Sequence, residues 1–342
     1  MRIGSLFSGI GGLDLACEQA FGGETVWQVE REPYCQRVLE SRWPNAKRHS
    51  DVREVGAHNL EPIDLLCGGF PCQDLSQAGR HAGLDGDKSG LYLELLRVAQ
   101  ELTPAYVVME NVPKLLHYQQ RLEGDFARIG YGLLWQQCEA SDAGAPHKRK
   151  RVFVLAVRGM QGSELLASPL GQRDLFAPSW APPSSGAVKW PAPTVKGNHN
   201  KAGLSSKAGD GLSTAVKWPT PCSRDYRSGT GCTAKTQAKR RGSPQLPEVV
   251  GGCLNPAWVE LLMGFPVGWT VPGVEVGEHA WPMGRGGEQA SHEPPRLVAP
   301  RSVPDRPARL KALGNAVVPQ QGAGALARML SVHKKMSQDV DD

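Results

Sequence analysis

The chain has 342 residues, of which 40% are hydrophobic and 21% are charged, as in a globular protein with one large or two medium-sized domains. No apolar run approaches the roughly 18 residues of a membrane-spanning helix, and the N-terminus lacks a signal-peptide pattern, so we expect a cytoplasmic protein with no membrane partner. The eight cysteines are irregularly spaced and form no Cys-x-x-Cys pair, which argues against a disulfide framework and a metal site.

Positive charge is concentrated in one part of the chain. The whole chain has a net charge of +5, but residues 188–246 contain eleven Lys and Arg against two Asp, a local net charge of +9. Such a concentration is typical of a surface that binds a polyanion. The same region contains AVKWPAPT and AVKWPTPC, which are either edge segments anchored by tryptophan or nucleic-acid contacts.

The first 158 residues alternate short apolar runs with longer helical patterns. We expect strands at residues 3–7, 25–30, 63–67, 106–110, 133–138 and 152–157. Helices are expected at residues 13–21, 33–42, 90–102 and 115–129, each stopped by a nearby Gly or Pro. This alternation predicts an α/β fold with a doubly wound, mostly parallel, Rossmann-like sheet, in which ligands bind beyond the carboxyl ends of the strands.

The composition changes near Gly159, after which Pro, Gly, Ser, Lys and Trp dominate. We expect a first domain at residues 1–158 and a smaller, irregular, basic domain at 159–252. A C-terminal segment at 253–334 would return to the first domain with a final helix, and 335–342 would form a disordered tail. Within that segment, the Pro- and Gly-rich residues 272–307 suggest no particular role.

Glycines and acids follow the first expected strands. Gly9, Gly11 and Gly12 lie between a strand and a helix, where backbone can approach a ligand closely. Glu30 ends the next strand 21 residues after Gly9, a spacing at which an acid reaches the hydroxyl groups of a bound ribose. Asp51 is a further acid, suited to accept from an adenine amino group. Each acid alone is equally well a strand cap, but the set favours an adenosine-containing cofactor.

Three further groups of polar residues follow or begin strands. Cys72, in GGFPCQDLSQAG, sits in a loop stiffened by Pro71 and is a nucleophile, a metal ligand or an ordinary cysteine; no second Cys or His at ligand spacing supports the metal. Glu110 ends an apolar strand and is either a strand cap or a site acid. Arg149 and Arg151 are two residues apart near a strand start, so we expect both side chains on one face; otherwise they form a basic strand edge.

Taken in order, FSGIGG, Glu30, Asp51, GGFPCQ, MENV, PHKRKR, LMGFP and GNAVVP resemble the motifs of the DNA cytosine-5 methyltransferases. The resemblance extends from Ile3 to Pro319, and PCQ followed by ENV is its most specific part. It implies the fold of class I methyltransferases. It also implies transfer of a methyl group from S-adenosylmethionine to C5 of a flipped cytosine in a specific duplex DNA sequence, through a covalent bond between Cys72 and C6.

The resemblance implies roles by position. Cys72 corresponds to the nucleophile, Glu110 to the acid at N3 of the base, and Arg149 and Arg151 to arginines that support the flipped base. Cofactor binding is assigned to Phe7, Gly9, Gly11, Gly12, Glu30, Asp51, Asn315 and Val317. Residues 159–252 become the target-recognition domain, and we expect its DNA contacts from Lys189, Lys217, Arg224, Arg227, Lys239, Arg240 and Arg241. No metal is expected.

Some positions depart from the family pattern. His147 stands where Gln is common, Glu30 is followed by Arg31-Glu32 where Glu-x-Asp is frequent, and LNPAWVELLMGFP lacks a leading arginine. None of these changes affects Cys72 or Glu110. We therefore expect an active, monomeric enzyme with double-stranded DNA as its partner, and a cognate restriction endonuclease as a genetic partner.

Other classes fit the residues less well. A nicotinamide-dependent dehydrogenase would need a G-x-G-x-x-G turn, and an amino-methyltransferase would need a Pro-Pro-aromatic motif; the sequence has neither. The intact catalytic positions disfavour a DNA-binding module without activity. An RNA cytosine methyltransferase would need less target-recognition machinery than residues 159–252 provide.

Overall fold

The computed structural model describes residues 1–70, 90–166, 218–227, 245–285, 289–299 and 301–338. The chain divides into two compact units. The sheet unit comprises Met1–Cys138, Lys150–Leu175 and Val317–Asp342, and the second unit comprises Glu139–Arg149 and Phe176–Ala316. Most of the predicted target-recognition domain, residues 159–252, lies outside the described residues, so its boundaries stay a prediction.

The sheet unit is built on one sheet, with the strand order β3-β2-β1-β4-β5-β7-β6-β8. Its strands are β1 (Arg2–Leu6), β2 (Glu24–Val29), β3 (Lys47–His49), β4 (Leu65–Gly68), β5 (Tyr106–Asn111), β6 (Tyr131–Cys138), β7 (Arg151–Arg158) and β8 (Ser163–Leu166). The pairs from β3 to β5 and the pair β6–β8 are parallel, whereas β7 is antiparallel to β5 and β6. The predicted doubly wound, mostly parallel sheet is therefore confirmed.

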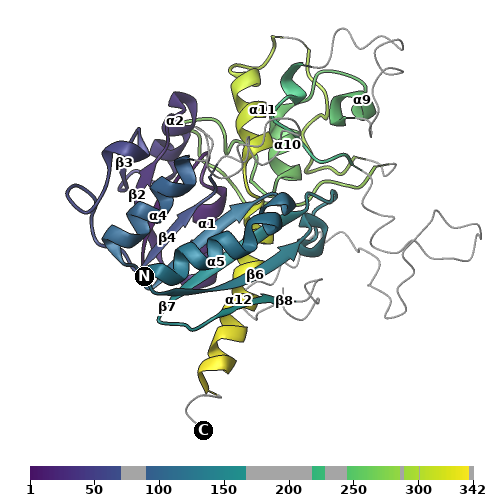
Figure 1. Ribbon diagram of the computed structural model, residues 1–342. Coiled ribbons are helices and arrows are strands. Elements are labelled where there is room, and N and C mark those ends of the chain that lie inside the picture. The colour runs from purple at the N-terminus through teal and green to yellow at the C-terminus, as the bar shows by residue number, and fades with distance from the viewer. Residues whose placement is uncertain (71–89, 167–217, 228–244, 286–288, 300, 339–342) are drawn as a thin grey trace, which may run out of the picture. The chain divides into compact units, whose positions relative to one another are not determined.

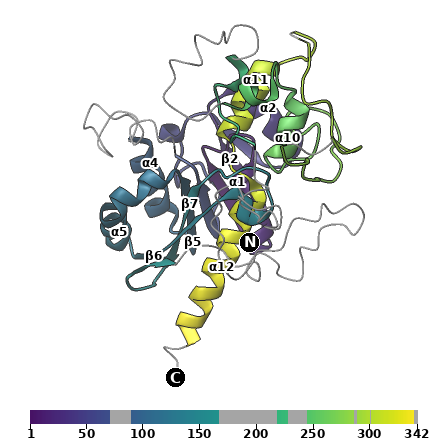
Figure 2. The ribbon, with the colours of Figure 1, turned by 90° about the vertical axis from the view of Figure 1, so that its right-hand side faces the viewer.

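Helices cover both faces of this sheet. They are α1 (Gly12–Phe21), α2 (Pro33–Arg42), α4 (Gly90–Leu102), α5 (Gln119–Arg128) and α12 (Pro319–Gln338), with the 3-10 turns η1 (Val52–Glu54) and η3 (Pro113–Tyr118). Figures 1 and 2 show α4 and α5 on one face and α1 and α12 on the other. Successive strand residues therefore enter different cores: Leu66 packs with Tyr92, whereas Leu65 packs with Leu326.

Glycines set the ends and the packing of α1. The helix begins after Gly11, which has a φ of 83°, and ends at Gly22, which has a φ of 67° and donates its N–H to Glu18 O at 2.9 Å. A side chain at Gly322 would place its Cβ 2.7 Å from that of Ala16. The final helix α12 thus lies directly against α1.

In the described part of the second unit, short helices are separated by irregular segments: η4 (Ala140–Ala143), η5 (Asp225–Arg227), α9 (Leu246–Val250), α10 (Pro256–Leu262) and α11 (Arg306–Asn315). The buried Glu260 joins α10 to α11, because it accepts from Arg309 Nη2 at 2.9 Å and from Gly268 N at 2.7 Å. Trp258 donates from Nε1 to Glu293 at 3.2 Å, so part of the Pro- and Gly-rich stretch packs on α10.

The expected elements differ from the observed ones mainly at short or proline-containing segments. β3, β8, α9 and α11 were not predicted, and the expected helix at 115–129 is η3 followed by α5. α12 continues to Gln338, so the prediction of a disordered tail was wrong for residues 335–338. Within the described ranges, we find no helix with both the length and the hydropathy needed to cross a membrane.

Candidate active site

The carboxyl ends of five neighbouring strands meet at one edge of the sheet. β3, β2, β1, β4 and β5 run parallel, so the residues that follow them lie on the same side. β7 runs in the opposite direction, and its register pairs Val152 with Asn111 at the end of β5. The first residue of β7, Arg151, therefore lies at this edge as well.

The turn after β1 has an unusual backbone. Phe7, Gly9 and Gly11 have φ values of 56°, 57° and 83°, and positive φ at a non-glycine residue such as Phe7 is typical of functional sites. A Cβ at Gly11 would lie 2.2 Å from the ring of Trp43, whereas a Cβ at Gly9 would meet nothing within 4 Å. The turn is therefore covered by Trp43 at Gly11 and open at Gly9.

Glu30 follows β2 and is bonded to this turn. Gly9 N donates to Oε2 at 2.7 Å, and Glu32 N donates to Oε1 at 2.7 Å. A carboxylate accepts about four hydrogen bonds, so acceptor positions remain for the hydroxyl groups of a ligand. Burial raises the pKa of Glu30 above its ordinary value, although the backbone donors act in the opposite direction.

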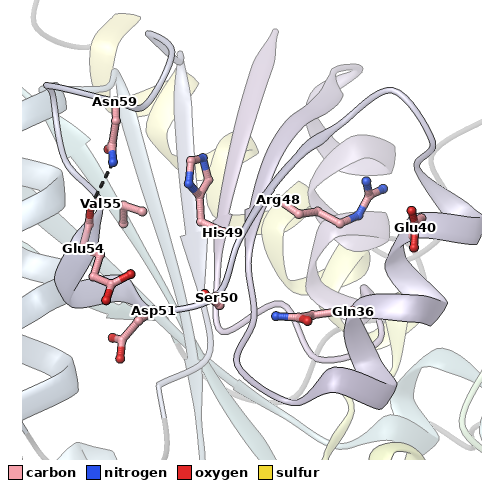
Figure 3. A pocket seen from close by; sticks show the side chains of 9 residues that line it. All are labelled: Gln36, Glu40, Arg48, His49, Ser50, Asp51, Glu54, Val55 and Asn59. Atoms are coloured by element: carbon pink, nitrogen blue, oxygen red, sulfur yellow. Dashed lines mark hydrogen bonds between the residues drawn. The ribbon is translucent and has the colours of Figure 1, made fainter.

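Asp51 follows β3 and borders a polar cavity. Its Oδ1 accepts from Arg53 N at 3.0 Å, and its Oδ2 lies 3.5 Å from Arg53 Nη1. The cavity has a volume of about 550 Å³, which is within the ~300–1,000 Å³ range of small-molecule sites. Figure 3 shows the side chains that line it, from α2, β3 and the segment after β3: Gln36, Glu40, Arg48, His49, Ser50, Asp51, Glu54, Val55 and Asn59.

A buried polar network lies beneath the turn after β1. Asp14, in the first turn of α1, accepts from Ser5 Oγ at 3.0 Å and from Gln28 Nε2 at 2.8 Å. Ser8 Oγ donates to Ser5 Oγ at 2.8 Å, so the network continues to the turn. Burial raises the pKa of Asp14 to about 7, despite the opposing effect of the hydrogen bonds from Gln28 and Ser5.

Glu110 and Arg151 form an ion pair at the β5–β7 edge. Arg151 Nε lies 2.8 Å from Glu110 Oε1, and the two side chains are 18% and 12% exposed. The pair is thus nearly enclosed, yet still reachable by a ligand.

The described start of the Cys72 loop lies against this pair. A Cβ at Gly69 would be 3.3 Å from Glu110 Oε2, and Asn111 Nδ2 donates to the carbonyl of Phe70 at 3.1 Å. Cys72 itself lies outside the described residues. Phe70, two residues before Cys72, is hydrogen-bonded to Asn111, the residue that follows Glu110.

Residues 1–205 match the family model of the C-5 cytosine-specific DNA methylases. The chain belongs to this family. Among curated relatives, it is 36% identical over 165 residues to the Type II methyltransferase M2.BsuMI of Bacillus subtilis (strain 168), covering 46% of this chain and 42% of the relative. It is 31% identical over 183 residues to the Type II methyltransferase M.Bsp6I of Bacillus sp. (strain RFL6), covering 50% and 57%. The chain spans about half the length of the curated relatives it matches.

Solved structures resemble the fold over nearly the whole chain. The S. pombe Dnmt2 methyltransferase has a TM-score of 0.59 at 15% identity, covering 97% of this chain and 98% of that one. A putative DNA modification methyltransferase encoded within an E. coli prophage has a TM-score of 0.52 at 19% identity, covering 98% and 99%. The expected class I methyltransferase fold is thereby confirmed.

Arg149 lies before β7, which begins at Arg151, so the strand alternation from which a common face was expected does not extend to it. Arg149 has a φ of 36°, which interrupts the strand alternation two residues before Arg151. Its buried guanidinium donates to the carbonyls of Pro221 at 3.2 Å, Gly314 at 3.2 Å and Ala316 at 2.6 Å. In this family member, Arg149 therefore ties backbone segments of the second unit together, while Arg151 pairs with Glu110.

His147, which replaces the glutamine common in the family, is also buried. Its Nε2 lies 2.6 Å from the carbonyl of Leu262, the last residue of α10. The imidazole is thus in contact with the end of α10.

The remaining predicted positions are distributed between the units. Asn315 is the exposed last residue of α11 in the second unit, whereas Val317 is buried in the sheet unit and packs in the core that contains α1 and α12. Arg224 and Arg227 are exposed on and beside η5. The other expected DNA contacts lie outside the described residues: Lys189, Lys217, Lys239, Arg240 and Arg241.

Two residues near the turn were not singled out from the sequence. Trp43, which donates to Glu18 at 2.8 Å, precedes the helix-stopping Pro44 and shows no local pattern that would place it over Gly11. Asp14 interrupts the apolar run of α1. A charged residue on an otherwise buried helix face is unusual, and this pattern could have identified Asp14 as a site residue from the sequence.

Proposed function

We propose that the chain is a DNA cytosine-5 methyltransferase, which transfers a methyl group from S-adenosylmethionine to C5 of a cytosine in duplex DNA. The observation that carries the proposal is the Glu110–Arg151 pair, set against the chain that leads to Cys72. Family membership supports the same reaction class. The relatives are named Type II methyltransferases, which favours a cognate restriction endonuclease as genetic partner.

The turn after β1 and Glu30 fit an adenosine-containing cofactor. The open backbone at Gly9 admits a ligand, and Glu30 retains acceptor positions for ribose hydroxyls while its remaining bonds hold it to the turn. Asp51 borders the neighbouring cavity, and we assign the adenine end of the cofactor to its side. Once bound, S-adenosylmethionine supplies an electrophilic methyl group.

The chemistry requires a nucleophile because C5 of cytosine is too electron-poor to accept a methyl group directly. In our proposal, the Cys72 thiolate forms a bond to C6, and the electron pair of the C5–C6 double bond moves to C5. Glu110, in its protonated form, donates a hydrogen bond at N3 and offsets the negative charge that develops in the ring. After C5 is methylated, a water molecule takes the C5 proton, the C5–C6 double bond re-forms, and the C6–S bond breaks to release the thiolate.

The base must leave the helix for this attack, because the thiolate approaches perpendicular to the ring. Arg151 binds one carboxylate oxygen of Glu110, and no bond to the other is found among the described residues, so we assign that oxygen to the extruded base. The basic residues of the second unit would hold the phosphates on either side, and those that the structure describes, Arg224 and Arg227, are exposed.

The test is incubation of the protein with methyl-labelled S-adenosylmethionine and duplex DNA, followed by chromatography of the nucleosides. We expect label in 5-methylcytosine, and a loss of at least 100-fold in Glu110→Gln, as is usual for a charge-stabilising group. Glu164→Gln, at an exposed position of β8, is the matched control and should retain activity. Label in N4-methylcytosine or in N6-methyladenine would contradict the proposal, and so would a parallel incubation in which RNA is labelled and duplex DNA is not.

A further inference from the structure

A short turn of the second unit, residues 221–227, is held rigidly and is called here the arginine turn. Asp225 is buried and accepts from Cys222 twice, from its N–H at 2.8 Å and from its Sγ at 2.9 Å. These two bonds close the loop on itself around η5. The turn is therefore held by bonds between its own residues.

The arginine turn is also fastened to α11. A Cβ at Gly314 would lie 2.2 Å from the backbone of Cys222, so the two backbones touch. Arg149 donates to the carbonyl of Pro221 at 3.2 Å, and Arg306 donates to the carbonyl of Tyr226 at 3.4 Å. Side chains at 224–227 therefore project from a fixed support, which is where precise recognition groups are effective.

Arg227 is itself pre-oriented by its neighbour. Its guanidinium lies over the ring of Tyr226, 5.4 Å from the centroid, and its Nε donates to Tyr226 Oη at 2.9 Å. The side chain is exposed, and Nη1 and Nη2 have no bonding partner among the residues that the structure describes. The planar edge that carries these two nitrogens is thus presented to the outside.

We propose that Arg227 is a specificity-determining residue that reads a guanine of the target duplex. Nη1 and Nη2 would donate to O6 and N7 of guanine in the major groove, the commonest specific contact between arginine and DNA. This inference rests on the proposed function, since it assumes duplex DNA as substrate. A fixed, planar donor pair has little entropy to lose on binding and matches a base edge, whereas a phosphate contact needs charge more than orientation.

Arg224 provides an internal comparison on the same turn. It is equally exposed, but no ring or hydroxyl group orients it among the described residues. We expect it to contact phosphate, which carries no sequence information. Loss of Arg227 should therefore change the sequence preference of the enzyme, whereas loss of Arg224 should weaken its activity on all sequences.

The test is methylation of a pool of duplexes with random bases around cytosine, followed by sequencing of the methylated positions. We expect wild type to require guanine at one position, and Arg227→Ala to lose that preference by roughly 10–100-fold while the affinity for duplexes without that guanine falls little. Arg224→Ala should lower methylation of all sequences alike. Tyr226→Phe should weaken the guanine preference without abolishing it.

Several results would overturn the inference. If Arg227→Ala keeps the guanine preference, or lowers methylation of all sequences equally, Arg227 contacts phosphate or nothing. Loss of the thermal unfolding transition in Arg227→Ala would show a structural role instead. If wild type methylates no duplex in the pool, the proposed function itself fails, and the assignment of Arg227 fails with it.

Discussion

Asp14 is a buried carboxyl group in the hydrogen-bond network beneath the proposed cofactor turn. It lies at the start of α1 with both oxygens accepting hydrogen bonds, and burial raises its pKa from an ordinary 3.8 to about 7. Gln28 Oε1 is buried without a partner among the described residues. If the Gln28 amide were turned over, a protonated Asp14 would donate to that oxygen.

The raised pKa of Asp14 predicts a pH-dependent stability. The folded state keeps the proton up to about pH 7, whereas the unfolded chain releases it near 3.8, so the stabilisation is complete below about pH 4 and is lost as pH rises through 7. The loss is at most ~4 kcal/mol. We expect Asp14→Asn to show a flatter profile and to exceed wild type in stability above pH 7, measured by urea unfolding. Glu24→Gln, at an exposed position, should follow wild type. Parallel profiles for wild type and Asp14→Asn would refute the prediction.

Among single residues, those that follow a strand could be placed from the sequence, because parallel strands end at one edge. Glu30, which follows β2, and Glu110, near the end of β5, were placed in this way, whereas Arg151 was expected at the start of a strand and begins the antiparallel β7. Arg149 could not be placed, since its φ of 36° breaks the period of two on which the prediction depended. Its carbonyl partners at 221, 314 and 316 are also remote in sequence.

At the scale of elements, the turn between β1 and α1 depends on contacts with the end of α2. Gly11 combines a positive φ with a closely packed neighbour, the ring of Trp43, and Glu18 on α1 binds the Trp43 indole. Gly22, at the other end of α1, has a similar φ of 67° but would meet nothing within 4 Å as alanine. A comparison of alanine substitutions at the two glycines therefore distinguishes the cost of backbone strain, which both share, from the cost of steric overlap, which only Gly11 has.

We expect Gly22→Ala to cost about 1 kcal/mol, the usual strain of a left-handed alanine. Gly11→Ala should cost several kcal/mol, roughly 2–4, because the indole must also move. It should in addition weaken S-adenosylmethionine binding by more than 10-fold, measured by calorimetry, while Gly22→Ala binds like wild type. Equal effects of the two substitutions would show that Trp43 does not support the turn.

Long elements were predictable and short ones were not. α2 and α4 have the expected bounds because both their apolar periods and their terminal prolines are clear. β3 has three residues and β8 four, too few for a readable alternation. α11 was hidden by Pro307, which ends the Pro- and Gly-rich stretch but lies in the first turn of the helix, where proline is tolerated.

For the whole molecule, the uneven charge distribution predicts that DNA affinity depends strongly on salt concentration. Residues 188–246 have a net charge of +9 in a chain whose net charge is +5. If about six of these cations contact phosphates, the logarithm of DNA affinity should fall with the logarithm of salt concentration with a slope of roughly −5. Fluorescence anisotropy on a labelled duplex measures this slope. A slope near zero would place the DNA-binding surface elsewhere.

The most direct measurement of the central claim is covalent trapping on duplex DNA that contains 5-fluorocytosine. Fluorine at C5 cannot leave as a proton, so a nucleophile that has added to C6 cannot be released after methylation. With S-adenosylmethionine present, we expect a stable protein–DNA adduct that mass spectrometry maps to Cys72, and no adduct in Cys72→Ser. Normal formation of 5-methylcytosine by Cys72→Ser, or wild-type turnover on ordinary DNA without any adduct on the fluorinated duplex, would contradict the account.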